Sequence, residues 1–216
     1  QDQTFPAVRR LREAFPGKMV LPGFEWNIPG HDHASVVFAS EDPDSLSDFE
    51  YICDAVDTDS GRDLPKWNRT HADALACAAF LEGSRSRSSF LLMNHPSRFP
   101  VCSVADLRDL NDAAPNVAFG FEGIPGHQKK DARGGYNYVS PYRFDNDRWR
   151  THGGADYMAA KVGGAWDALL GEGRRFFLFA NSDFHNTHND FRPGEYARSC
   201  TFVKGEGLVD TNRFGL

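Results

Sequence analysis

Helical and strand-like hydrophobic patterns alternate along most of this chain. Within residues 5–15, Val8, Leu11 and Ala14 recur at the spacing of an amphipathic helix, and Pro16-Gly17 is expected to end it. A short strand is expected next, at 19–21. The same order, a helix and then a short apolar strand, is predicted three more times, with helices at 70–81, 104–110 and 155–170 and strands at 90–93, 117–121 and 176–180.

Short strands that are apolar throughout are typical of strands buried on both faces. Their alternation with helices predicts an α/β fold with a parallel sheet or a barrel, in which functional residues gather at the carboxyl ends of the strands. A length of 216 residues suits a single domain. Residues 40–66 and 123–154 show no regular pattern, so we expect loops beside a site or surface insertions there.

Composition and charge narrow the class of protein. No apolar stretch approaches the roughly 20 residues that a membrane helix needs, so no membrane partner is expected. The formal net charge of -6 does not favour binding to a nucleic-acid backbone. The four cysteines lie far apart in the sequence. We expect buried free thiols, and two disulfides are the alternative if the protein is exported.

Carboxylate and imidazole side chains stand beside four of the predicted strands. Such oxygen and nitrogen atoms bind divalent metals, and ligands from separate strand ends can converge on one ion. For a single histidine, the alternative is a hydrogen-bonded core or capping residue. The repetition of the pattern instead predicts one shared metal centre, with candidate ligands Glu25, His31, His33, His95, Asp183 and His185.

In the order and context of these residues, most of the chain resembles the polymerase and histidinol phosphatase (PHP) superfamily. The motifs that match are Gly23-Phe24-Glu25, His33 before an apolar strand, His95-Pro96 after a buried strand, and Ser182-Asp183-Phe184-His185. The resemblance implies a metal-dependent phosphoesterase on a distorted (β/α)7 TIM-like barrel with up to three divalent ions, which we expect to be manganese, zinc or iron.

The resemblance also implies roles for individual residues. Glu25 would bridge ions, and together with His33 and His95 it would complete one metal site. His31 is the fallback for the role of His33. Asp183 and His185 would bind a neighbouring ion whose other ligands are missing from this sequence.

The opening motifs of the family, a strand that ends in His-x-His and a Thr-Asp-His turn, do not precede Glu25. We therefore expect an incomplete barrel that lacks its first strands and either needs a partner or shows an open sheet. Two explanations are open: the chain is part of a longer enzyme, which we favour, or it is a natural variant that has lost part of the centre.

These residues predict hydrolysis of a phosphate mono- or diester through a metal-activated water, with a phosphorylated small molecule or nucleotide as substrate. Asp183 would bind an ion or accept the proton of the attacking water. Glu122 and His127 are further catalytic candidates, and the alternative for them is a strand-end Glu and a Pro-Gly turn with local hydrogen bonds.

Two other functions fit parts of the pattern. One is an amidohydrolase-like hydrolase of C–N bonds, although a recognisable metal-bridging lysine is missing. The other is a non-catalytic binding domain that a metal stabilises.

Overall fold

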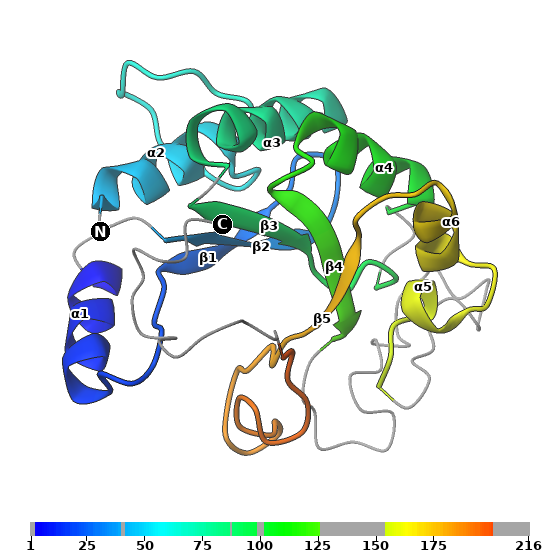
Figure 1. Cartoon of the computed structure of the whole chain (residues 1–216). Coiled ribbons are helices and arrows are strands. Elements are labelled where there is room, and N and C mark those ends of the chain that lie inside the picture. The colour runs from blue at the N-terminus through cyan, green and yellow to red at the C-terminus, as the bar shows by residue number, and fades with distance from the viewer. Residues whose placement is uncertain (1–2, 40–41, 87, 99–101, 126–153, 201–216) are drawn as a thin grey trace. The chain divides into compact units, whose positions relative to one another are not determined.

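The computed structural model describes residues 3–39, 42–86, 88–98, 102–125 and 154–200 (Figure 1). It shows an α/β protein whose five strands form one mixed sheet in the order β1-β2-β3-β4-β5. The elements are α1 Thr4–Ala14, β1 Gly23–Asn27, β2 His33–Phe38, α2 Pro43–Cys53, α3 His71–Arg85, β3 Ser89–Met93, α4 Val104–Ala113, β4 Ala118–Ile124, α5 Tyr157–Ala160, α6 Ala165–Gly171 and β5 Phe177–Ala180.

The chain divides into two compact units. Within the described residues, the first unit comprises the chain up to Leu91 together with Leu110–Ala118. The second unit comprises Leu92–Asp109 and the described residues from Phe119 onward. Each unit is described by itself below.

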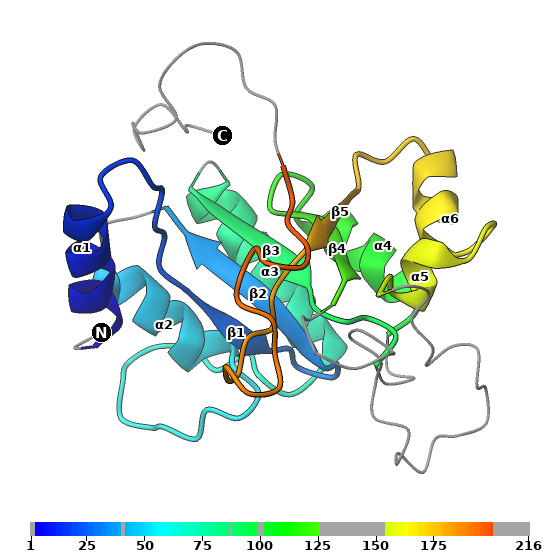
Figure 2. The ribbon, with the colours of Figure 1, turned by 90° about the horizontal axis from the view of Figure 1, so that it is seen from below.

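The first unit is built around an antiparallel hairpin of β1 and β2, in which Glu25 lies opposite Ser35. Successive side chains of a strand point to opposite faces, so Trp26 and its buried neighbours on β2 share one face. Helices α2 and α3 lie over that face (Figures 1 and 2). The ring of Phe49 on α2 packs against three aromatic rings of the hairpin, those of Phe24, Trp26 and Phe38.

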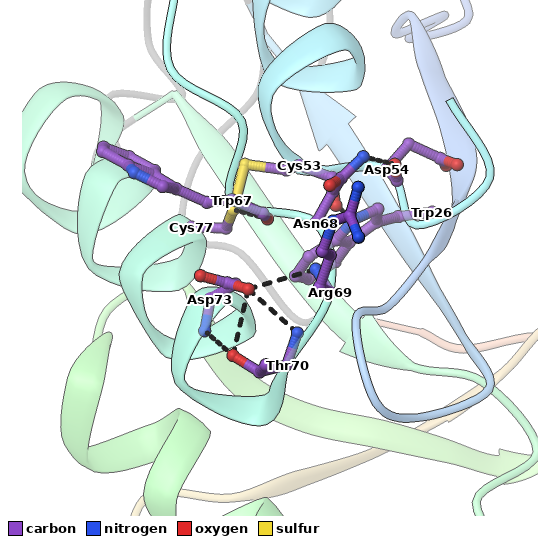
Figure 3. The surroundings of a disulfide bond; sticks show 9 residues. All are labelled: Trp26, Cys53, Asp54, Trp67, Asn68, Arg69, Thr70, Asp73 and Cys77. Atoms are coloured by element: carbon purple, nitrogen blue, oxygen red, sulfur yellow. Dashed lines mark hydrogen bonds between the residues drawn. A yellow bond between two sulfur atoms is a disulfide. The ribbon is translucent and has the colours of Figure 1, made fainter. Parts of the chain in front are cut away.

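A disulfide bond between Cys53 and Cys77 joins the end of α2 to α3 (Figure 3). Both cysteines are fully buried. Beside the bond, the indole Nε1 of Trp26 donates to the carbonyl oxygen of Cys53 at 2.8 Å. The expectation of free thiols is therefore wrong for this pair, because α2 packs on α3 and brings together two residues that are 24 positions apart in the sequence.

The second unit contains a parallel pair of strands, β4 and β5, in which Glu122 lies opposite Phe179. Helices α5 and α6 follow one another closely (Figure 2). The sequence predicts a single helix over 155–170, and the structure corrects this to two short helices. The break falls at Gly163, whose φ of +73° lies in the left-handed region, and at Gly164, where a Cβ would lie 2.7 Å from the carbonyl oxygen of Lys161.

The other predicted elements compare with the structure as follows. The α/β class is confirmed, and so are the helices and strands after residue 70 apart from the single helix over 155–170 and the exact ends of the others. The strand expected at 19–21 is wrong, since β1 begins at Gly23. The irregular segment 40–66 contains α2, and most of 123–154 lies outside the described residues.

The sheet departs from an all-parallel arrangement, because the short turn between β1 and β2 makes them antiparallel. In the part of the chain that the structure describes, the sheet is open, with β1 and β5 at its ends. The seven-stranded barrel stays a prediction. Among these residues no helix has the length and apolar character needed to cross a bilayer.

Candidate functional site

In the first unit, Glu25 and His33 lie next to each other on the hairpin face opposite the aromatic core. Because Asn27 pairs with His33, Glu25 is a diagonal neighbour of His33 across the two strands. The distance from Glu25 Oε1 to His33 Nδ1 is 3.2 Å, and the other ring nitrogen of His33 lies 3.5 Å from Asp32 Oδ1. The Glu25 side chain is 44% exposed and that of His33 is 25% exposed, so both remain accessible.

In the second unit, His95 follows β3 and is almost fully buried. Its backbone has a φ of +28°, and its N–H donates to Glu122 Oε2 at 2.7 Å. Glu122 comes from β4 and is 1% exposed. This contact fixes the backbone of His95 at the carboxyl end of its strand.

Burial raises the pKa of Glu122 to about 7. The charge of His95 and its backbone N–H act in the opposite direction, whereas the nearby carboxylates of Asp183 and Asp156 raise the pKa further. The carboxyl group therefore exchanges its proton near neutral pH.

Asp183 and His185 follow β5. The backbone of Asp183 has a φ of +42°, and its Oδ1 lies 3.6 Å from His185 Nδ1. The side chain of buried Asp190 accepts hydrogen bonds from the backbone N–H groups of His185 and Asn186, at 2.8 and 2.9 Å. The loop that carries the two candidate ligands is thereby closed by a second acidic residue, Asp190.

Sequence reasoning missed Asp156, which lies directly before α5 and has no exposed surface. Its carboxylate accepts hydrogen bonds from the backbone N–H of Ser97 at 3.2 Å, from Ser97 Oγ at 2.7 Å and from the backbone N–H of Met158 at 2.8 Å. Asp156 thus supports the turn that follows His95. Its position as the N-cap of a short helix was the available signal.

Sequence reasoning also missed a pocket of about 900 Å³ in the first unit. It is lined by one end of β1, by α2 and by the loop that follows α2. The pKa of Glu50 is raised by burial and by the neighbouring carboxylates of Asp54 and Asp57. The charged residues that line the pocket are Glu25, Asp44, Glu50, Asp54, Asp57, Asp59 and Arg62.

Two of the predicted site residues remain, His31 and His127. His31, the fallback ligand, has its Nε2 2.7 Å from Nδ1 of His71, the first residue of α3. His127 lies outside the described residues.

Comparisons with known proteins found no match to this chain. No family model matches the chain, and no curated protein or solved structure matches it. Any functional assignment therefore depends on the residues described above.

Proposed function

We propose that the chain is a metal-dependent phosphoesterase of the PHP type that hydrolyses a phosphate mono- or diester of a small molecule or nucleotide. The proposed metal ligands are Glu25, His33, His95, Asp183 and His185. In this proposal the five described strands are part of the distorted (β/α)7 barrel.

One backbone observation carries the proposal. Within the described residues, the non-glycine residues with positive φ are His95 and Asp183, and both were predicted as ligands from sequence. A conformation of this kind is uncommon in residues other than glycine, and it tends to persist at functional sites. The hydrogen bond from His95 to Glu122 holds one of these residues in place. A role for the side chain in binding explains why glycine does not occupy either position.

The donor set of the first unit fits a metal as well. When two ligand atoms each lie about 2.1 Å from one ion, they lie about 3 Å from each other. The 3.2 Å between Glu25 Oε1 and His33 Nδ1 agrees with this spacing. A carboxylate beside an imidazole suits manganese, iron or zinc. When bound, such an ion supplies a water of lowered pKa and positive charge near the phosphoryl oxygens.

The residues of the chain have separate roles in this proposal. Glu122 is buried and bound to the backbone of His95, so we assign it to positioning His95 and not to contact with substrate. Asp183, whose side chain is 25% exposed, is the accessible carboxylate that can accept a proton from an attacking water. The acidic pocket beside Glu25 disfavours a phosphate by itself, which makes bound cations a requirement for binding a phosphoester there.

Metal content tests the ligand assignment. The chain is purified without chelator, and its metal-to-protein ratio is measured by elemental mass spectrometry for the wild type, Glu25→Gln and His95→Asn. Asparagine tolerates positive φ, so His95→Asn removes the imidazole without adding backbone strain. We expect both variants to lose metal. The matched control is Glu13→Gln on α1, whose side chain is exposed and which we expect to retain the wild-type ratio.

Hydrolysis of an aryl phosphate by the metal-loaded protein tests the activity. We expect turnover by the wild type and by Glu13→Gln, and little by Glu25→Gln. Metal binding without turnover of aryl phosphate monoesters or diesters would favour a non-catalytic metal-stabilised domain. Cleavage of an aryl amide without cleavage of the phosphates would favour the amidohydrolase alternative. Phosphate hydrolysis that survives complete metal removal would refute the proposal.

A further inference from the structure

His31 and His71 form a facing pair of imidazoles within the first unit. His31 lies in the turn between β1 and β2, and His71 is the first residue of α3. The 2.7 Å between His31 Nε2 and His71 Nδ1 joins residues that are 40 positions apart in the sequence. The ring planes meet at 75°, and both residues are half-buried. Tertiary packing alone brings these two ring nitrogens together.

The backbone on the His31 side is tightly held. The N–H of Ile28 donates to the carbonyl oxygen of Asp32 at 2.9 Å, and the N–H of His31 donates to the carbonyl oxygen of Ile28 at 3.0 Å. Gly30 has a φ of +80°, and a Cβ at this position would lie 3.1 Å from the backbone nitrogen of His71. Glycine suits this turn, because a side chain there would be strained by the positive φ and would crowd the start of α3.

The backbone on the His71 side is held by a capping box. The side chain of Thr70 accepts a hydrogen bond from the N–H of Asp73, and the carboxylate of Asp73 accepts one from the N–H of Thr70 (Figure 3). The disulfide between Cys53 and Cys77 ties the same helix to α2 one turn further along. Both imidazoles are therefore carried by backbone segments that are fixed before any ligand arrives, which reduces the ordering cost of binding.

We propose that His31 and His71 together bind a borderline divalent cation such as Zn²⁺ or Cu²⁺. Imidazole nitrogens suit these ions, whereas Mg²⁺ and Ca²⁺ prefer oxygen ligands. Two nitrogens that each lie about 2.1 Å from one ion are about 3.0–3.4 Å apart, so small rotations of the two rings make room for the metal. Binding replaces the hydrogen bond between the rings: the donor nitrogen gives up its proton to water, and that ring takes a proton on its other nitrogen, so that both rings bind as neutral imidazoles.

This site does not depend on the proposed phosphoesterase function. It uses two imidazoles, whereas the phosphoesterase proposal for the same unit uses Glu25 and His33. It also gives His31 a role of its own, which leaves His33 as the ligand beside Glu25.

The test uses the full chain with Glu25→Gln and His33→Asn, which removes the accessible ligand pair of the other proposal in this unit. Zn²⁺ is titrated into this protein by isothermal calorimetry, and the ¹⁵N signals of the histidine rings are followed by NMR. We expect zinc to shift the ring signals of His31 and His71 together, and we expect His71→Asn to remove one equivalent of bound zinc. His188→Asn in the same background is the matched control, since His188 is an exposed histidine of the second unit.

Two outcomes would overturn the site. One is a zinc stoichiometry that His71→Asn leaves unchanged in a protein that is shown to be folded by circular dichroism. The other is the absence of zinc-dependent shifts at both rings, which would leave the pair as a hydrogen bond only. Loss of aryl phosphate hydrolysis does not bear on either outcome, because the hydrolysis assay depends on Glu25 and His95 and not on His71.

Discussion

The candidate ligand Glu25 of the first unit lies on an open strand face, whereas the candidate ligands of the second unit lie in turns that buried carboxylates hold. In the first, Phe49 and Trp26 form the core, and the candidate ligand Glu25 lies on the open face of the hairpin. In the second, buried Glu122 and Asp156 hold the turns beside the candidate ligands. The same kinds of side chain therefore have different structural weight in the two units.

This difference predicts how each unit tolerates substitutions. A ligand that lies on top of an apolar core can be replaced without disturbing the fold, because few buried contacts depend on it. A buried carboxylate that satisfies several donors cannot, since its loss leaves those donors without a partner. Substitutions at Glu25 should therefore separate metal binding from stability, whereas substitutions at Glu122 or Asp156 should change both.

The largest effect is expected in the aromatic core. Phe49→Ala removes a fully buried ring that packs against Phe24, Trp26 and Phe38, and we expect a loss of about 3–5 kcal/mol in the free energy of unfolding. Denaturant unfolding followed by tryptophan fluorescence measures it. The control is Phe15→Ala, because Phe15 is 55% exposed and its loss should change stability by less than about 0.5 kcal/mol. Equal effects at both positions would contradict an aromatic core.

This core was not predicted from the sequence, because the pattern that we used did not find α2. Asp42 followed by Pro43 is an N-terminal helix signal, and Leu46, Phe49 and Ile52 recur every three residues. The acidic and serine-rich composition concealed that spacing. The partner of Cys53 depends on the same helix, so the disulfide was missed for the same reason.

The candidate site was predictable where it depends on strand ends and unpredictable where it depends on tertiary packing. A rule based on carboxyl ends located His95 and Asp183, because a short apolar strand precedes each of them. No local pattern indicates that Glu122 bonds to the backbone of His95, 27 residues away, or that His31 meets His71. Such contacts depend on how elements pack, and a single sequence contains no local signal for them.

The next largest effect concerns the disulfide in the first unit. Replacing both Cys53 and Cys77 by Ala releases a loop that the bond closes across 24 positions, and we expect a loss of about 3 kcal/mol through the greater entropy of the unfolded chain. Thermal unfolding of the double variant measures it. Treating the wild type with a reductant under unfolding conditions should give the same loss. If the variant matches the oxidised wild type, the disulfide contributes nothing to the stability of the first unit.

A smaller effect is expected at the buried carboxylate of Asp156. Asp156→Asn replaces one acceptor oxygen by an N–H donor next to the N–H and hydroxyl groups of Ser97, and we expect a loss of about 1–3 kcal/mol. Denaturant unfolding measures the loss. The matched control is Asp63→Asn on an exposed segment of the first unit. A loss in Asp156→Asn no greater than in the control would mean that the second unit does not depend on its buried polar contacts.

The last expected effect is a pH dependence that comes from Glu122, and it is small over any single pH unit. Its folded-state pKa of about 7 lies above the ordinary value of 4.5 for a glutamate. Between these two values the unfolded chain has lost the proton while the folded chain keeps it, so the free energy of unfolding falls as pH rises. The free energy of unfolding should fall by at most about 1.4 kcal/mol for each pH unit. This dependence should be confined to the range from about pH 4.5 to about pH 7.

Subtracting the stability curve of Glu122→Gln from that of the wild type isolates this contribution from that of the histidines. The measurement is denaturant unfolding with chelator present, from pH 4 to pH 8, with Glu13→Gln as the exposed control. We expect the difference curve to slope downward in this window for Glu122→Gln and to stay flat for Glu13→Gln. A flat curve for Glu122→Gln would show that the buried carboxyl ionises as it does in water. The second unit would then hold His95 with a charged acceptor, and the contrast with exposed Glu25 would be larger, because burial of a charged carboxylate costs more than burial of a neutral one.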